Sequence, residues 1–240
     1  SLNTVITFLG AITAVILLVF RDTILGFVTG IHVSTSKNLK IGDWIGIPKY
    51  NIEGNIQDIN LLTTKIVNFD KTISTIPTYD LLSTEIRNHQ VMYEGSSRRI
   101  KRSIYFNIKS FKFVDDEFYE KVKDINLISE YMDRKLREIA ESKKNIPHAE
   151  RIINGQQLTN IGLFRNYVLN YLKNNPKVDQ DEIVLVRQLE ISPQGMPLEI
   201  YCFANKAELV DYERIQADIF DHILTAAQEF DLEIMQVAKA

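Results

Sequence analysis

The sequence has a single cysteine, no excess of positive charge and none of the short motifs of common enzyme classes. Cys202 excludes an internal disulfide, and its place in the apolar run 199–203 predicts a buried, reduced thiol in a reducing compartment. A net charge of −3 argues against nucleic-acid binding, because such binding calls for a basic surface. Phosphate-binding loops, dinucleotide-binding glycine motifs and zinc-protease motifs are all missing, so the sequence does not indicate an enzyme.

The residues that could bind a metal are scattered along the chain. The four histidines are His32, His89, His148 and His222, and their spacing matches no type of metal site. The acidic residues 115–117 stand where a helix is expected to begin, and negative charge there complements the helix dipole without calcium. We therefore expect no catalytic residue, no metal and no cofactor.

A long uncharged segment opens the chain. The residues from Ser1 to Phe20 carry no charge, and Arg21 and Asp22 follow directly. A helix of about 20 residues spans roughly 30 Å, the thickness of the hydrocarbon core of a bilayer. We interpret the segment as a membrane span. Two alternatives stay open, a buried helix of a soluble protein and a secretory signal, although the basic start and the small-residue cleavage site of a signal are both missing.

Polar and small residues interrupt this segment, namely Asn3, Thr4, Thr7, Thr13, Gly10, Ala11 and Ala14. A helix that packs against copies of itself around a water path uses both kinds of side chain. The composition therefore predicts a pore-lining helix. Because the chain starts with Ser1 and not with methionine, we also expect it to be the C-terminal part of a longer protein with further spans upstream.

Gly26 and Gly30 form a G-x-x-x-G pair in the moderately apolar run that follows. Glycines at this spacing allow close helix packing, and they also weaken a helix enough to permit a bend. Both roles stay open. We expect a second, shorter helix at an angle to the first.

Beyond Leu39 the pattern changes to short runs rich in Ile, Val and Thr that are separated by turn residues. Such runs predict a small twisted sheet or barrel that ends near Asn88. The basic run 96–102 then leads into the next module. We interpret it as a solvated face, with an anionic-lipid or ion-attracting patch as the alternative.

The rest of the sequence predicts a mixed domain. We expect strands at 104–114, 183–189, 198–203 and 232–237, and helices at 116–141, 161–172 and 211–230. This β-α-β-β-α-β order is that of a ferredoxin-like α+β domain, here with a helical insertion at about 128–160. The predicted domains are a pore-lining helix with a kinked second half (1–38), a β module (39–95) and an α+β domain (96–240).

Five stretches of the sequence resemble one family: Val19–Gly26, Gly42–Ile45, Asp70–Ile73, Ile76–Tyr79 and Val186–Leu189. In combination they are similar to the small-conductance mechanosensitive channel (MscS) family, and most to its miniconductance branch. The resemblance implies an Sm-like β module and a homo-heptamer in a bacterial inner membrane, with the C-terminal domains in the cytoplasm. It implies a channel that membrane tension opens and that releases ions and small solutes after hypo-osmotic shock. The implied partners are membrane lipids and copies of the chain.

The same resemblance places Ala14 and Leu18 at the two apolar constrictions of the pore. Alanine is too small to seal a wide ring, so we predict closure at Leu18, with Phe20 either completing the ring or facing lipid. Arg21 and Asp22 would repeat in every subunit just past this ring. Unpaired charges there are costly, so we predict that the two pair between neighbouring subunits. Asp22 stands where the best-known member of the family has its hinge glycine, which leaves the two later glycines as candidates for the bend.

A membrane-anchored oligomeric scaffold without conduction is the alternative function. It would use the same segments but would give no tension-gated current. A soluble enzyme is a third alternative, although no catalytic motif supports it.

Overall fold

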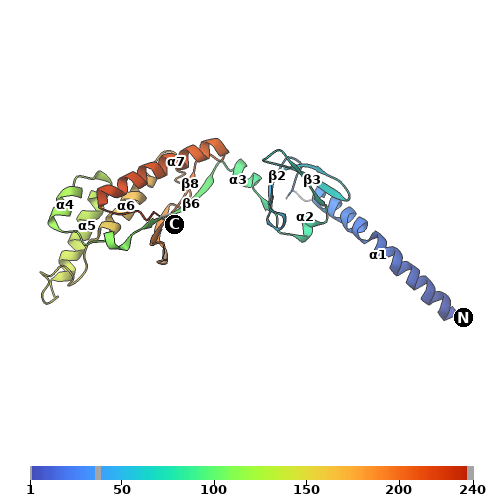
Figure 1. The fold of residues 1–240 in the computed structure, drawn as a ribbon, viewed down its shortest axis with the longest axis horizontal. Helices are drawn as coiled ribbons and strands as arrows, with labels where there is room; N and C mark the ends of the chain where they lie inside the picture. Colours follow the sequence, from blue (N-terminus) through green and yellow to red (C-terminus); the bar gives the residue numbers. More distant parts are fainter. Residues whose placement is uncertain (1, 36–38, 237–240) are drawn as a thin grey trace. The chain divides into compact units, whose positions relative to one another are not determined.

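The computed structural model describes residues 2–35 and 39–236. The chain divides into two compact units, residues 1–94 and 95–240. The first unit holds one long helix and a β module, and the second is an α+β domain (Figure 1). The expected fold class, an apolar helix followed by a β module and an α+β domain, is confirmed.

Helix α1 spans Leu2–Thr35, and its apolar composition without proline favours a helix of this length. Two threonines of its apolar part are satisfied locally, since the Thr7 and Thr13 hydroxyls each donate to the carbonyl four residues earlier at 2.9 Å. We expected a break near Gly26 or Gly30, but α1 continues through both glycines. A glycine costs a helix about 1 kcal/mol relative to alanine, which is too little to interrupt a continuous hydrogen-bond ladder. The described residues thus contain no separate second helix at an angle to the first.

The β module is a five-stranded antiparallel sheet in the order β4-β3-β2-β1-β5. Its strands are β1 (Trp44–Ile47), β2 (Ile52–Ile59), β3 (Thr63–Asn68), β4 (Ile73–Pro77) and β5 (Arg87–Asn88). The short helical elements are η1 (Pro48–Tyr50), α2 (Asp80–Ser83) and α3 (Gln90–Glu94). Isoleucines from four strands fill the core, namely Ile45, Ile47, Ile56, Ile66 and Ile76. Val33 of α1 joins this core, so the helix and the sheet share one hydrophobic cluster.

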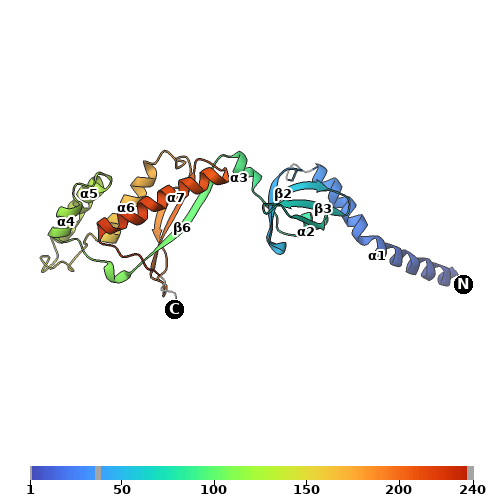
Figure 2. The same ribbon diagram turned by 45° about the horizontal axis from the view of Figure 1, so that its top comes forward.

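The second unit is built on a three-stranded antiparallel sheet in the order β6-β8-β7. Its elements are β6 (Arg98–Phe106), η2 (Ile108–Ser110), α4 (Asp116–Val122), α5 (Asn126–Lys143), α6 (Asn160–Lys173), β7 (Leu185–Gln188), β8 (Met196–Ala204), α7 (Leu209–Ala226) and η3 (Ala227–Phe230). Helices α6 and α7 lie on one face of this sheet (Figure 2). Ile234 adds an antiparallel bridge at the other edge of β6, through Phe106. The predicted last strand is reduced to this bridge, and Val237, its expected end, lies outside the described residues.

The basic run 96–102 lies mostly inside strand β6, which begins at Arg98 and not at Ile104 as expected. The strand pairs with β8 over its whole length, and buried Ile100 continues the inward row of Ile104. Arg98 and Arg102 point to the same side, where their guanidinium groups lie 4.3 and 4.8 Å from the centres of two aromatic rings of α7. Because two of the inward positions hold arginines, residues 98–103 do not show the alternation of apolar and polar residues that predicts a strand.

The expected helix at 116–141 is two helices, α4 and α5, with a turn at residues 123–125. Phe118 of α4 and Ile128 of α5 are both buried in the same hydrophobic cluster. A turn between the two helices lets both apolar faces reach that cluster, which one straight helix would not allow.

Candidate pore helix and its contact with the β module

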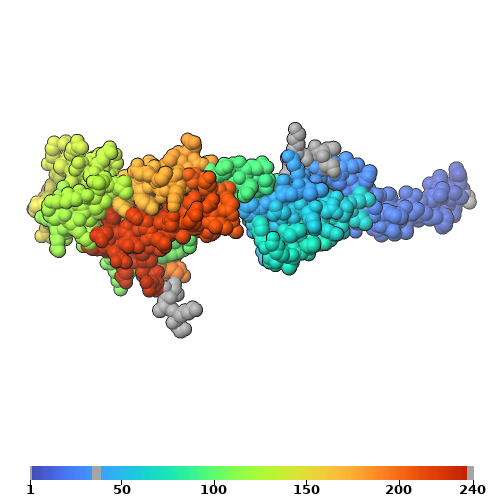
Figure 3. All heavy atoms as spheres, turned by 90° about the horizontal axis from the view of Figure 1, so that it is seen from above, coloured from blue at the N-terminus to red at the C-terminus, as the bar shows by residue number. Residues whose placement is uncertain are grey.

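The first part of α1 makes no close contact with the β module of its own unit. Every residue from Leu2 to Asp22 is exposed, and in Figure 3 this part of the helix stands clear of the β module. An 18-residue stretch of this helix has a mean hydropathy of 2.3, and 0% of that stretch is buried within the described chain. Exposed apolar surface costs about 25 cal/mol per Å² in water, so lipid or other chains must cover it. The described part of this chain therefore does not itself bury the segment.

Helix geometry decides which predicted constriction residues can face a common axis. Successive residues turn by about 100°, so Ala14 and Leu18 lie about 40° apart on one side of α1. Asp22 lies about 40° further round on the same side, whereas Phe20 lies about 160° from Leu18. A ring formed by Leu18 would therefore turn Phe20 away from the axis, toward lipid or a neighbouring helix.

The second part of α1 docks on the β module through one face of the helix. A Cβ built on Gly26 would lie 2.1 Å from the carbonyl oxygen of Leu61, in the turn between β2 and β3. Thr29 and Val33, on the same face, are only 1% and 4% exposed. The Thr29 hydroxyl donates to the Leu25 carbonyl at 2.7 Å, so its burial leaves no polar group unsatisfied. Only glycine permits this close approach of helix and turn.

The two glycines of the G-x-x-x-G pair differ in their surroundings. A Cβ on Gly30 would meet no atom within 4 Å, in contrast to one on Gly26. The sequence did not distinguish the two positions, and it did not point to the turn at Leu61 as the contact. Whether either glycine also acts as a hinge stays a prediction.

The turn that receives α1 is itself fixed by hydrogen bonds. The Thr78 amide donates to the Leu62 carbonyl at 3.0 Å, and the Thr78 hydroxyl donates to the Asn60 carbonyl at 2.6 Å. Just beyond, the Tyr50 hydroxyl donates to the Asp80 carboxylate. This hydrogen bond holds the pKa of Asp80 below its ordinary value, helped by a nearby serine hydroxyl and lysine. The turn that contacts α1 is thus hydrogen-bonded to Thr78, the residue after β4.

Arg21 and Asp22 end the run of α1 in which every residue is exposed. Within the described part of the chain, neither takes part in an ion pair. Adjacent residues project in different directions on a helix, so the two side chains do not face each other. Their pairing with a neighbouring subunit stays a prediction.

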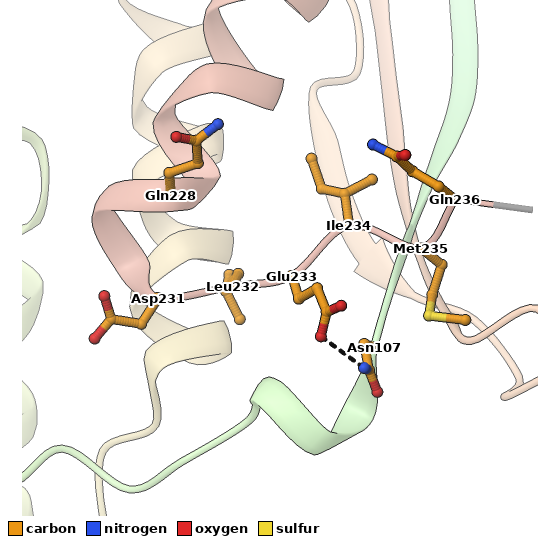
Figure 4. A pocket seen from close by; sticks show the side chains of 8 residues that line it. All are labelled: Asn107, Gln228, Asp231, Leu232, Glu233, Ile234, Met235 and Gln236. Carbon is orange, nitrogen blue, oxygen red and sulfur yellow. Dashed lines mark hydrogen bonds between the residues drawn. The ribbon is translucent and has the colours of Figure 1, made fainter.

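The α+β unit carries a pocket at the edge of its sheet, beside the C-terminal segment (Figure 4). There the Asn107 side-chain amide donates to the Glu233 carboxylate at 2.7 Å, and the backbone amide of Met235 donates to the Tyr105 carbonyl at 2.8 Å. These bonds hold the segment on β6. Among the described residues, no group of three or more His, Cys, Asp or Glu side chains could hold a metal ion.

Cys202 is free and buried in the same unit, as expected from the sequence. Burial raises the pKa of its thiol to about 12. The thiol is therefore unreactive in the folded unit.

These features define a class of protein with three parts in chain order: an apolar helix, a β module and an α+β domain. The first half of the helix is exposed, and its second half packs on the β module at a glycine. Two sequence models of the same family match this chain. The model of the mechanosensitive ion channel β-domain matches residues 22–91, and that of the C-terminal part of mechanosensitive ion channel MscS matches residues 149–234. The chain belongs to the MscS family of mechanosensitive ion channels, which are not enzymes.

Similar proteins agree with this assignment. The low conductance mechanosensitive channel YnaI of Escherichia coli (strain K12) is 24% identical over 228 residues, which cover 95% of this chain and 52% of YnaI. The chain thus spans about half the length of that relative.

Two solved structures have the same fold. The cryo-EM structure of Arabidopsis thaliana MSL1 superposes with a TM-score of 0.64 at 17% identity, covering 99% of this chain and 66% of that one. The crystal structure of Helicobacter pylori MscS in its closed state gives a TM-score of 0.59 at 16% identity, covering 99% of this chain and 73% of that one.

Proposed function

We propose that this chain forms a mechanosensitive ion channel that membrane tension opens, releasing ions and small solutes on hypo-osmotic shock. The observation that carries the proposal is the division of α1: its apolar first part is wholly exposed, and its second part is docked on the β module. Tension favours the state with the larger in-plane area, so stretch shifts a closed–open equilibrium toward the open state.

Self-association is part of the proposal, because one helix cannot enclose a pore. A ring of copies would cover the exposed apolar surface of α1 with lipid on one side and with neighbouring helices on the other. The resemblance to the family supports a homo-heptamer in a bacterial inner membrane, with both C-terminal domains in the cytoplasm. The assignment to the miniconductance branch stays a prediction.

Within this ring we propose Leu18 as the apolar closure, with Ala14 one turn away on the same side of the helix. A narrow ring of apolar side chains excludes water and therefore ions. Arg21 and Asp22 would follow the ring and pair between neighbours. The contact between Gly26 and Leu61 would make the β module move with α1.

Patch recording from liposomes that contain the protein tests this function. We expect stepwise current that appears only above a threshold of applied tension. A protein that inserts and self-associates but gives no current up to the tension that ruptures the patch would overturn the channel function and favour the membrane-anchored scaffold.

A further inference from the structure

A cavity of about 380 Å³ lies in the α+β unit, between helices α5 and α6 and the segment 156–159. Its volume falls in the range of about 300–1,000 Å³ that small-molecule sites have. Tyr131, Lys135 and Ile139 stand four residues apart on α5, so they present one face of that helix to the cavity. These residues and the segment fall within the predicted insertion at 128–160, which therefore provides most of the cavity.

Arg165 of α6 gives the cavity an unpaired positive charge. Its guanidinium forms neither an ion pair nor a hydrogen bond with any other residue that the structure describes. Helix α6 itself contains no acidic residue, and none of the described residues that line the cavity is acidic. Lys135, by contrast, is already paired with Glu138 at 2.6 Å. The charge of Arg165 is thus available to a ligand.

Three further side chains of the cavity carry hydrogen-bonding groups that are not used within the chain. The side-chain amides of Gln156 and Gln157 and the hydroxyl of Tyr131 form no hydrogen bond to any described residue. Each glutamine amide has two N–H donors and one acceptor, and the phenol has one donor. Beside these polar groups, buried Ile139 and Leu158 supply an apolar surface.

The N-terminal turn of α6 adds no free amide to the cavity. The Gly162 amide donates to the Thr159 hydroxyl at 3.1 Å, and the Leu163 amide donates to the Thr159 carbonyl at 3.0 Å. The Ile161 amide donates to the Asn160 side chain at 2.9 Å. The capacity to bind a ligand therefore comes from the side chains and not from the end of the helix.

We propose that this cavity binds a small organic anion whose carboxylate or phosphate group contacts Arg165. The planar guanidinium can donate two parallel hydrogen bonds to either kind of group. The two glutamines and the tyrosine bind the other polar groups of the ligand, and its hydrocarbon part packs on Ile139. An inorganic ion alone would leave most of the cavity unfilled, because one water molecule takes up only about 30 Å³. The site is separate from the proposed pore and gives the insertion a ligand of its own.

Isothermal titration calorimetry on the detergent-solubilised full chain tests this site. The probes are 4-hydroxybutyrate, which carries a carboxylate, and glycerol 3-phosphate. Their uncharged counterparts, 4-hydroxybutanamide and glycerol, are the ligand controls. We expect at least one of the two anions to bind at millimolar concentrations and neither uncharged counterpart to bind.

Two arginine variants separate a specific site from general attraction of anions. Arg165→Gln should weaken binding at least about tenfold, because it removes a contact made of two charge-assisted hydrogen bonds. Arg137→Gln is the matched control, since Arg137 lies on α5 outside the cavity and donates to the Asp133 carbonyl at 3.1 Å. Both arginines are exposed, so neither change should disturb the fold. We expect Arg137→Gln to keep the wild-type affinity.

Each outcome has a distinct meaning. Anion binding that Arg165→Gln alone weakens supports the inference, and the anion that binds shows whether the group is a carboxylate or a phosphate. The inference is overturned if neither anion binds, if Arg165→Gln leaves the affinity unchanged, if both variants weaken binding equally, or if the uncharged counterparts bind as well as the anions. None of these results changes the tension-gated current, so the proposed function is tested separately.

Discussion

Replacement of Gly26 by alanine tests how α1 is joined to the β module. The new Cβ would lie 2.1 Å from the Leu61 carbonyl oxygen, a backbone atom that cannot rotate away. Helix or turn must shift by more than about 1 Å, and overpacking of this kind costs about 1–3 kcal/mol. Alanine offsets about 0.5–1 kcal/mol of this cost, because it is the better helix former.

Gly30→Ala is the matched control for this variant. It brings the same gain in helix propensity, but its Cβ meets no atom within 4 Å. We expect Gly30→Ala to stabilise the protein by about 0.5–1 kcal/mol. The propensity term is common to both variants, so the free energy of unfolding should differ between them by about 1–3 kcal/mol, the overpacking cost alone.

Trp44, the only tryptophan, lies in β1 and reports on the β module. Its fluorescence during urea unfolding of the detergent-solubilised protein gives the midpoint and the slope for each variant. Equal midpoints for the two alanine variants would refute the close contact between α1 and the turn.

Three further predictions concern charge and burial. Asp80→Asn should lower stability by about 1–2 kcal/mol at pH 7, because the Tyr50 hydroxyl then meets a neutral acceptor. The pKa of Asp80 in the folded state lies below its unfolded value of about 4, so the greater stability of the wild type is fully present above pH 4 and is lost as the pH falls through the folded pKa. Urea titrations measure the difference in the free energy of unfolding between wild type and variant, and a difference that stays constant down to about pH 2 would contradict this reasoning. Cys202, whose pKa burial raises to about 12, should react with a maleimide at pH 8 about 10³-fold more slowly than in urea, and equal rates would show an open α+β unit. Arg21→Asp should change the tension threshold of the channel and the swap that adds Asp22→Arg should restore it, whereas a swap that behaves like the single variant would argue against pairing between subunits.

The parts predicted best from the sequence depend on neighbouring residues alone. The absence of charge from residues 1–20 is such a local property, and it located the exposed apolar helix. The β module could be predicted for the same reason, because its buried isoleucines alternate within short runs bounded by turn residues.

The sequence predictions failed at positions whose structure depends on contact with a residue far away in the sequence. Arg98 and Arg102 sit on the inner side of β6 because aromatic rings of α7, more than a hundred residues later, stack on them. In the same way, Gly26 looked equivalent to Gly30 until the turn at Leu61 was known. Sequence spacing cannot reveal such contacts.

The central claim is that the exposed face of α1 that contains Leu18 closes a pore. Tension-clamped patch recordings of Leu18→Ser and Leu9→Ser test it most directly, because Leu9 is also exposed but lies about 180° away on the helix. We predict that Leu18→Ser opens at a clearly lower tension than wild type, since a polar ring admits water, and that Leu9→Ser keeps the wild-type threshold. Identical thresholds for the two variants, or no tension-gated current from any of the three proteins, would contradict the claim.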